Sequence, residues 1–188
     1  MMPRLLLEAP MTADAIDPWT TPEERSRAAT FRSERRRCEY LTWRALLRRE
    51  LGPDLRIDYD ALGAPILPDG EAFISVSHCD GRVAVLISSS RCAVDIEPSA
   101  RNFSRVADRY MTPSECALSE DPLWPGYVWC AKEALYKYAG RRAVDFRGDL
   151  RIEAVDLAAG SLTGRIADGR PLTLSASCRD GFLVVTLL

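Results

Sequence analysis

The sequence predicts an α+β protein built from two similar halves, each a long helix packed on a small, mostly antiparallel sheet. Three observations support this prediction: helix and strand signals follow in the same order twice along the 188 residues, two capping boxes begin equivalent helices, and one hairpin sequence recurs. Each half alone, at roughly 90 residues, would bury a thin core. We therefore expect the halves to share an interface as a pseudo-dimer within one chain, related by a pseudo-twofold.

The first half is expected to cover residues 1–98. Thr21-Pro22-Glu23-Glu24 is a capping box with proline at the first helical position, so it begins a helix. Gly52-Pro53 ends the arginine-rich helix that follows, and Asp80-Gly81 is a hairpin-turn signal. The elements expected here are the helix from Thr21, a second helix over 33–51, and strands over 72–78, 83–88 and 92–97.

The second half is expected to cover residues 99–188 and to repeat this order. Thr112-Pro113-Ser114-Glu115 is a second capping box, and Gly140 closes a helix expected over 127–139. The strands expected after this helix cover residues 150–157, 171–178 and 182–188.

A hairpin sequence near the middle of the chain recurs at its C-terminal end. Residues 74–87 (ISVSHCDGRVAVLI) align without gaps on residues 174–187 (LSASCRDGFLVVTL). Turn chemistry and strand period alone could produce the shared Asp-Gly and the alternating apolar residues, but the paired serines are harder to obtain that way. We interpret the repeat as a duplication. Since His78 of the first copy is Cys178 in the second, a site that uses the histidine would exist in one half only.

The composition argues against several classes of function. With 47% hydrophobic residues, 28% charged residues and a net charge of −2, the chain is typical of a globular protein, not of a nucleic-acid binder. No apolar run approaches the ~20 residues that span a membrane, and Leu5-Leu6-Leu7 is too short for a signal peptide. The six cysteines form no CxxC pair, so buried thiols are expected instead of a zinc site. We expect a cytoplasmic, monomeric protein with no membrane or nucleic-acid partner.

Positive charge is concentrated in one part of the chain. Residues 32–49 hold seven arginines against two acids, which usually means a solvated helix face but could also hold several phosphates or an acidic protein. Only two of the 25 basic residues are lysines, Lys132 and Lys137, and both lie in one helical segment. A lysine is a compact point charge that can follow a phosphate, so this pair is treated as a pointer to a phosphate site.

Two acidic residues on one strand are the first candidates for chemistry. In the segment Ala93-Val94-Asp95-Ile96-Glu97 side chains alternate, so Asp95 and Glu97 lie on one face. Two adjacent carboxylates repel each other, and a hard divalent cation such as Mg²⁺ would relieve that repulsion. A solvated strand end is the alternative, and it would be favoured if this were the only clue.

The second group of candidates lies on a helix, where Trp129, Glu133 and Lys137 share one face. An exposed Glu–Lys pair at this spacing is common and contributes only about 0.2–0.5 kcal/mol, but a tryptophan beside it is less typical of a solvated face. Ser77 and His78 lie at a strand end. A single histidine is more often structural than functional, yet at a turn it could donate to a phosphate, as could the serine hydroxyl.

Taken together, these segments resemble the motifs of 4'-phosphopantetheinyl transferases, in particular the surfactin-synthetase-activating type, which is a pseudo-dimer in one chain. The likeness covers roughly residues 21–140, and the duplicated hairpin extends it to the end. The VDIE strand and the WCAKEALYK helix are specific as a pair, whereas either alone is weak. The matching segments are 63–65 (GAP), 74–78 (ISVSH), 94–97 (VDIE) and 129–137 (WCAKEALYK).

The resemblance implies that the 4'-phosphopantetheine arm of coenzyme A is transferred to a serine of an apo acyl or peptidyl carrier protein, with Mg²⁺, releasing 3',5'-ADP. The implied metal ligands are Asp95, Glu97 and Glu133, which would place the site at the junction of the halves. Glu133 would also be the base, directly or through water, and Lys137 would hold the transferred phosphate. Lysine and Mg²⁺ suit this role because they neutralise charge that develops as the pyrophosphate linkage breaks.

The resemblance also implies where the remaining phosphates of coenzyme A bind. Ser77 and His78 match a strand-end pair that contacts them, and the candidates for the 3'-phosphate are Arg36, Arg37 and Arg44. Two departures from the family pattern occur: Cys79 stands where a serine is frequent, and Gly140-Arg141-Arg142 replaces a more glycine-rich stretch, which leaves the role of that loop open.

Two other function classes are compatible with parts of the pattern. A different Mg²⁺-dependent phosphate enzyme is one, but the chain has no glycine-rich phosphate loop of the form GxxxxGK[ST]. A non-catalytic carrier-binding module is the other, and it would be favoured by the loss of a metal carboxylate or of Lys137. None of these residues is missing, and the transferase is therefore the preferred interpretation.

Overall fold

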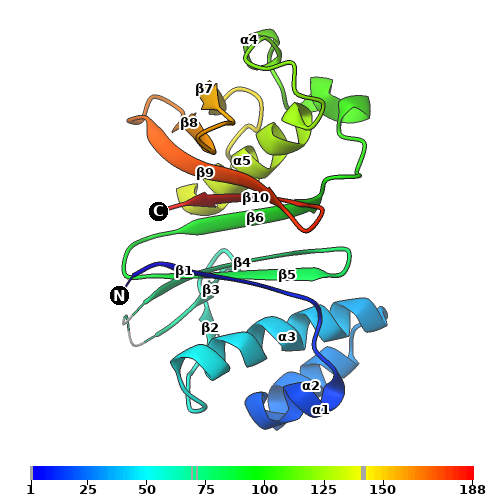
Figure 1. Ribbon diagram of the computed structural model, residues 1–188. Coiled ribbons are helices and arrows are strands. Elements are labelled where there is room, and N and C mark those ends of the chain that lie inside the picture. The colour runs from blue at the N-terminus through cyan, green and yellow to red at the C-terminus, as the bar shows by residue number, and fades with distance from the viewer. Residues whose placement is uncertain (1, 69, 71, 141–142) are drawn as a thin grey trace. The chain divides into compact units, whose positions relative to one another are not determined.

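The computed structural model describes residues 2–68, 70, 72–140 and 143–188 (Figure 1). The chain divides into two compact units, Met1–Ser89 and Ser90–Leu188. Both units combine helices with antiparallel sheets, which confirms the predicted α+β class. Two residues of the loop that departs from the family pattern, Arg141 and Arg142, lie outside the described residues. None of the helices in the described part of the chain has both the length and the apolar character needed to cross a membrane.

In the first unit, helix α3 packs against a three-stranded antiparallel sheet of order β1-β5-β4, and β2 and β3 form a separate pair (Figure 1). Ser33 caps α3 by accepting a hydrogen bond from the backbone N–H of Arg36. Apolar side chains of α3 and β5 form the core: Trp43, Leu46, Leu47, Val83, Val85 and Ile87. The elements are β1 (Arg4–Glu8), α1 (Ala13–Ile16), η1 (Asp17–Trp19), α2 (Pro22–Ala29), α3 (Glu34–Leu51), β2 (Asp58–Tyr59), β3 (Pro65–Ile66), β4 (Phe73–Cys79) and β5 (Arg82–Ser88).

In the second unit, helix α5 packs on a five-stranded antiparallel sheet of order β6-β10-β9-β8-β7 (Figure 1). Gly126 allows α5 to approach closely, because a Cβ there would lie 2.4 Å from Leu183 Cδ1 and 3.0 Å from Phe103. Gly140 ends the helix in the left-handed conformation, as expected. The elements are β6 (Ala93–Pro98), η2 (Ser104–Arg109), α4 (Pro113–Cys116), α5 (Trp124–Ala139), β7 (Leu150–Asp156), β8 (Ser161–Ile166), β9 (Leu172–Arg179) and β10 (Phe182–Leu187).

The boundary between the units lies at Ser89–Ser90 and not at residue 98, where it was expected. The reason is strand β6, which pairs with β10 from Ala93↔Leu187 to Pro98↔Phe182. That pairing joins residues about 90 positions apart, so local signals could not reveal it. As a consequence, Asp95 and Glu97 belong to the same unit as Glu133.

The repeated hairpin sequence forms the same hairpin in both units. Ile74 pairs with Ile87 and Leu174 pairs with Leu187, so the two copies have the same register. In each unit the second strand of the hairpin is also flanked by the first strand of that unit, β1 beside β5 and β6 beside β10. Both predicted capping boxes are confirmed as well, at Thr21 and at Thr112. The order of elements is therefore repeated within the chain.

Some strands were not predicted. The leucines of β1 do not alternate with polar residues, and β8 contains Gly164, which weakens a strand signal. Gly164 is nevertheless required, since a Cβ there would lie 2.9 Å from side-chain atoms of both Leu135 and Leu174. Close packing of α5 on the sheet explains this glycine.

Lys132, which the sequence analysis grouped with Lys137, has a structural position. Its side chain is 0% exposed, and its ammonium donates to Oε2 of Glu115 at 3.0 Å and lies 2.9 Å from Oε1 of the same carboxylate. A buried ion pair is tolerated when further hydrogen bonds satisfy both groups, and that condition is met here. The additional partners are the carbonyls of Tyr110 and Phe146 for Lys132 and the backbone N–H groups of Thr112 and Ile152 for Glu115.

Replacing Lys132 tests this assignment. Lys132→Met should lower the free energy of unfolding by about 3–5 kcal/mol, because it leaves the carboxylate of Glu115 buried without its cation. Denaturant unfolding of the purified variant measures this loss. Arg165→Met, which removes an exposed ion pair with Glu153 in the same unit, is the control and should change stability little. Equal stabilities of the two variants would contradict the structural role of Lys132.

Candidate functional site

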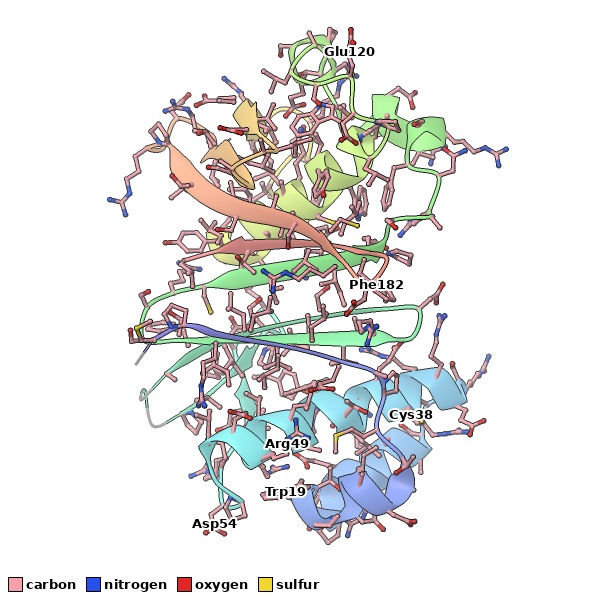
Figure 2. All side chains as sticks on the ribbon, in the orientation of Figure 1. Trp19, Cys38, Arg49, Asp54, Glu120 and Phe182 are labelled. Atoms are coloured by element: carbon pink, nitrogen blue, oxygen red, sulfur yellow. The ribbon has the colours of Figure 1, made fainter. Side chains whose placement is uncertain are left out.

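Helix α5 and strand β6 bring together the acidic residues and the second lysine that the sequence singled out. Figure 2 shows the side chains that fill the space between α5 and the sheet of the second unit. Lys137 Nζ donates to Asp95 Oδ1 at 2.8 Å and to the carbonyl oxygen of Val94 at 2.8 Å. Lys137 therefore has its hydrogen-bond partners on strand β6. The alternative from the sequence was an exposed ion pair with Glu133 on its own helix. Contact between α5 and β6 thus joins the two motifs of the sequence.

Glu97 is held by Trp129, which the sequence had placed on the helix face of Glu133 and Lys137, and by Arg101, which the sequence had not singled out. Its Oε1 accepts from Arg101 Nη1 at 2.7 Å and from the indole Nε1 of Trp129 at 3.1 Å. Trp129 lies one helical turn before Glu133 on α5, which explains the tryptophan on this face of the helix. Arg101 lies four residues after Glu97, in a segment without helix or strand. The spacing rules for helices and strands therefore did not point to it.

Asp95 has a further neighbour in Cys130, whose thiol is fully buried beside it. The pKa of this thiol is raised well above its ordinary value. Burial is the main cause of that rise, and the negative charges of Asp95 and Glu97 add to it. Cys130 is therefore a protonated thiol that can donate to Asp95. The expectation of buried thiols holds for Cys92 and Cys130, whereas Cys116 and Cys178 are exposed.

The proximity of the carboxylates changes the acidity of Glu133. The pKa of Glu133 is raised to about 7, mainly by burial; the carboxylates of Asp95 and Glu97 contribute to the rise, and Lys137 opposes it. Burial and the charge of Asp95 also raise the pKa of Glu97, although Arg101 and Trp129 oppose this. A carboxyl group that titrates near neutral pH can both accept and return a proton, which is the property of an efficient general base.

The donor chemistry of this cluster fits a hard divalent cation. Mg²⁺ prefers oxygen ligands, and neighbouring carboxylates such as Glu97 and Glu133, whose pKa values are raised by burial and by nearby negative charge, are stabilised by added positive charge. Within the described residues, however, no group of three or more His, Cys, Asp or Glu side chains is already arranged to hold a metal ion. Asp95 and Glu97 instead contact Lys137 and Arg101. A bound cation would have to compete with these two side chains.

A second cluster lies in the first unit and includes part of the predicted phosphate site. Arg36 Nη1 contacts Nε2 of His78, and the Nδ1 of His78 lies 3.2 Å from Oε2 of Glu39. Ser77 is in the same strand, β4, and is buried. Of the predicted arginines, Arg36 is therefore one that the structure brings to the histidine.

The other two arginines proposed for the 3'-phosphate are used differently. Arg37 donates to the carbonyl oxygen of Phe31 at 2.8 Å. Arg44 is 2% exposed, and its guanidinium lies 3.5 Å from the ring centre of Tyr40 and 3.8 Å from that of Trp43. It also forms an ion pair with Glu24 at 3.3 Å. The expected role of Arg44 is thus not supported, because stacking and the ion pair bury it in the first unit.

Residues 91–182 match the family model described as 4'-phosphopantetheinyl transferase superfamily. No curated protein matches the chain significantly. The matched segment contains β6, α5 and the whole carboxylate cluster, and it spans just under half of the 188 residues. The match therefore supports the assignment of this chain to that superfamily.

The acidity of Glu133 leads to a prediction for stability. Because its pKa is raised in the folded state, Glu133 stabilises the protein fully below pH 4.5, and this contribution is lost as the pH rises through about 7. Without divalent metal, Glu133→Gln should therefore raise the melting temperature relative to wild type at pH 8, and the difference should shrink towards pH 5. Thermal unfolding in EDTA measures it. Glu153→Gln is the control, and an equal effect of both variants at pH 8 would refute the prediction.

Proposed function

We propose that this protein transfers the 4'-phosphopantetheine group of coenzyme A to a serine of an apo acyl or peptidyl carrier protein, with release of 3',5'-ADP. One observation carries the proposal. The segment that matches the superfamily model is the segment in which β6 and α5 join Asp95, Glu97, Glu133 and Lys137. An ordinary solvated strand end and an exposed Glu–Lys pair would not explain this convergence.

In this proposal each residue of the cluster has a separate task. Asp95, Glu97 and Glu133 would hold Mg²⁺, which when bound supplies positive charge to the phosphate oxygens. Glu133, whose pKa is about 7, would accept the proton of the attacking serine hydroxyl directly or through water. Lys137 would contact the phosphoryl group that is transferred. Its ammonium is partly exposed, in contrast to the fully buried Lys132, and can exchange Asp95 for a phosphate oxygen.

The first unit would bind other phosphates of coenzyme A. Arg36 and His78 are in contact and lie at the surface, and both can offer N–H donors to an anion. Ser77, which precedes His78 in β4, stays a candidate for the same role. Arg37 is a candidate only if it leaves the carbonyl of Phe31.

The finer classification belongs to the proposal too. The repeated order of elements and the shared hairpin register support the surfactin-synthetase-activating type, in which one chain holds two similar units. A pseudo-twofold relation of the units, a monomeric state and a cytoplasmic location stay predictions. The carrier protein that is served could belong to fatty-acid, polyketide or nonribosomal-peptide synthesis.

The transfer reaction can be observed directly. Incubation of an apo-carrier with wild-type protein, coenzyme A and Mg²⁺ should add the mass of one phosphopantetheine group to the carrier. Asp95→Ala and Glu133→Gln should abolish this change while the fold, monitored by circular dichroism, is kept. An unmodified carrier with every carrier class tested would favour a non-catalytic binding module instead.

Kinetics of Lys137 variants test its contact with the phosphate. If the charge of Lys137 counts mainly in the transition state, Lys137→Met should lower kcat about 10²–10³-fold with little change in KM. Lys137→Arg should recover only part of the rate, because the guanidinium is larger and planar. Arg165→Met, a cation lost from an exposed part of the same unit, should turn over normally. Normal turnover by Lys137→Met would return this lysine to a structural role.

Affinity for coenzyme A tests the first unit. Dephospho-coenzyme A, which lacks the 3'-phosphate, should bind wild-type protein about ten-fold more weakly, because one charge-assisted contact is lost. Arg36→Met and His78→Gln should weaken coenzyme A binding and remove this preference, whereas Arg37→Met should keep it. Calorimetry gives these affinities, and equal binding of both ligands by wild type would exclude Arg36 and His78 from the 3'-phosphate.

A further inference from the structure

A buried glutamate lies beneath His78 in the first unit. Glu39, on α3 next to Cys38 (labelled in Figure 2), is 3% exposed, and its Oε2 lies 3.2 Å from Nδ1 of His78. The Nε of Arg35 lies 3.6 Å from its Oε1, and Nη1 of Arg36 lies 4.0 Å from its Oε2. Asp80, in the turn after β4, is a further charged neighbour and forms an ion pair with Arg35. A carboxylate is rarely buried in this way unless it has a partner.

The contacts define where the proton of His78 resides. Nε2 faces the guanidinium of Arg36, which can only donate, so Nε2 is the acceptor. The single ring proton is then on Nδ1, from which it is donated to the carboxylate of Glu39. Burial raises the pKa of Glu39, while the charges of Arg35 and Arg36 oppose that rise. The imidazole thus lies between a cation on one side and a buried carboxyl group on the other, and its neutral form satisfies both contacts.

A phosphate at this position would reverse the requirement on Nε2. A phosphate oxygen accepts hydrogen bonds, so Nε2 must carry a proton in order to contact it. The positive charge of Arg36 by itself disfavours a protonated, positively charged His78 ring. The charge of Glu39 and the charge of the phosphate both favour it. The imidazolium would donate from Nδ1 to Glu39 and from Nε2 to the phosphate, and Arg36 could then contact the same anion.

We propose that Glu39 is a positioning residue that couples phosphate binding at His78 to the uptake of one proton from solvent by Nε2. The coupling rests on the proposed role of His78 as a phosphate contact. This coupling makes phosphate binding depend on pH. Affinity falls as the pH rises, because protonation of the neutral imidazole costs more free energy at higher pH. Glu39 itself does not touch the ligand.

The experiment uses adenosine 3',5'-bisphosphate as the probe, with neither metal nor carrier present. Calorimetry at about pH 7.5 in two buffers of different ionisation enthalpy gives the number of protons taken up on binding. Since the chain has one histidine, its NMR signals give the titration of His78 without assignment. Wild-type protein should take up a proton, and the midpoint of the His78 titration should move to higher pH when the probe binds.

Glu39→Gln tests the role of the glutamate, because it keeps an acceptor oxygen and the side-chain size but removes the charge. The midpoint of the His78 titration should move down by about one pH unit or more, and affinity for the probe at pH 7.5 should fall about ten-fold. Glu34→Gln, at an exposed position in the first turn of the same helix, is the matched control and should behave as wild type.

Two results would overturn the inference. One is the absence of any buffer dependence in the wild-type protein, and this arm stays decisive even if Glu39→Gln fails to fold. The other is a folded Glu39→Gln protein whose His78 titration and proton uptake equal those of wild type, which would make Glu39 merely structural. The carrier mass assay is independent: transfer without proton uptake refutes the coupling alone, and proton uptake without transfer refutes the proposed function alone.

Discussion

The packing of α5 on β6 and β10 is the constraint on which the candidate site depends. The buried ion pair of Lys132 with Glu115 fixes the rotation of this helix, since the ammonium must reach both Glu115 and two backbone carbonyls. Glu133, the next residue, then lies about 100° further around the helix, on the face that contains Lys137 and Trp129. Lys132 and Glu133 are adjacent in sequence but serve different purposes, one structural and one chemical.

The second consequence of that packing is electrostatic. Burial is the main cause of the raised pKa of Glu133, and Asp95 and Glu97 of β6 lie close enough to add to it. The negative charge of these carboxylates is only partly compensated. Asp95 accepts a hydrogen bond from Lys137, and Glu97 accepts hydrogen bonds from Arg101 and Trp129. The fold thus holds negative charge in a place where it costs stability. Such an arrangement is typical of a functional site, because perturbed acids are retained where chemistry needs them.

Local features were predictable from the sequence, and long-range ones were not. The capping boxes at Thr21 and Thr112, the common face of Asp95 and Glu97 and the repeated hairpin follow from short-range rules of spacing and turn chemistry. The pairing of β6 with β10 set the boundary between the units, and no local signal shows it. The burial of Lys132 and Arg44 depends on tertiary contacts, which include the ion pairs with Glu115 and Glu24 and which short-range rules do not give. The type of residue alone had suggested a phosphate contact.

The central claim is that Asp95, Glu97 and Glu133 form one site that needs a divalent cation, and proton release on metal binding tests it most directly. Because the pKa of Glu133 is about 7, a fraction of this carboxyl group is protonated at neutral pH and must lose its proton to become a ligand. Titration of wild-type protein with Mg²⁺ at pH 7 should show binding accompanied by proton release, and Glu133→Gln should abolish the release. Mg²⁺ binding without proton release, or no binding in the presence of coenzyme A, would contradict the account.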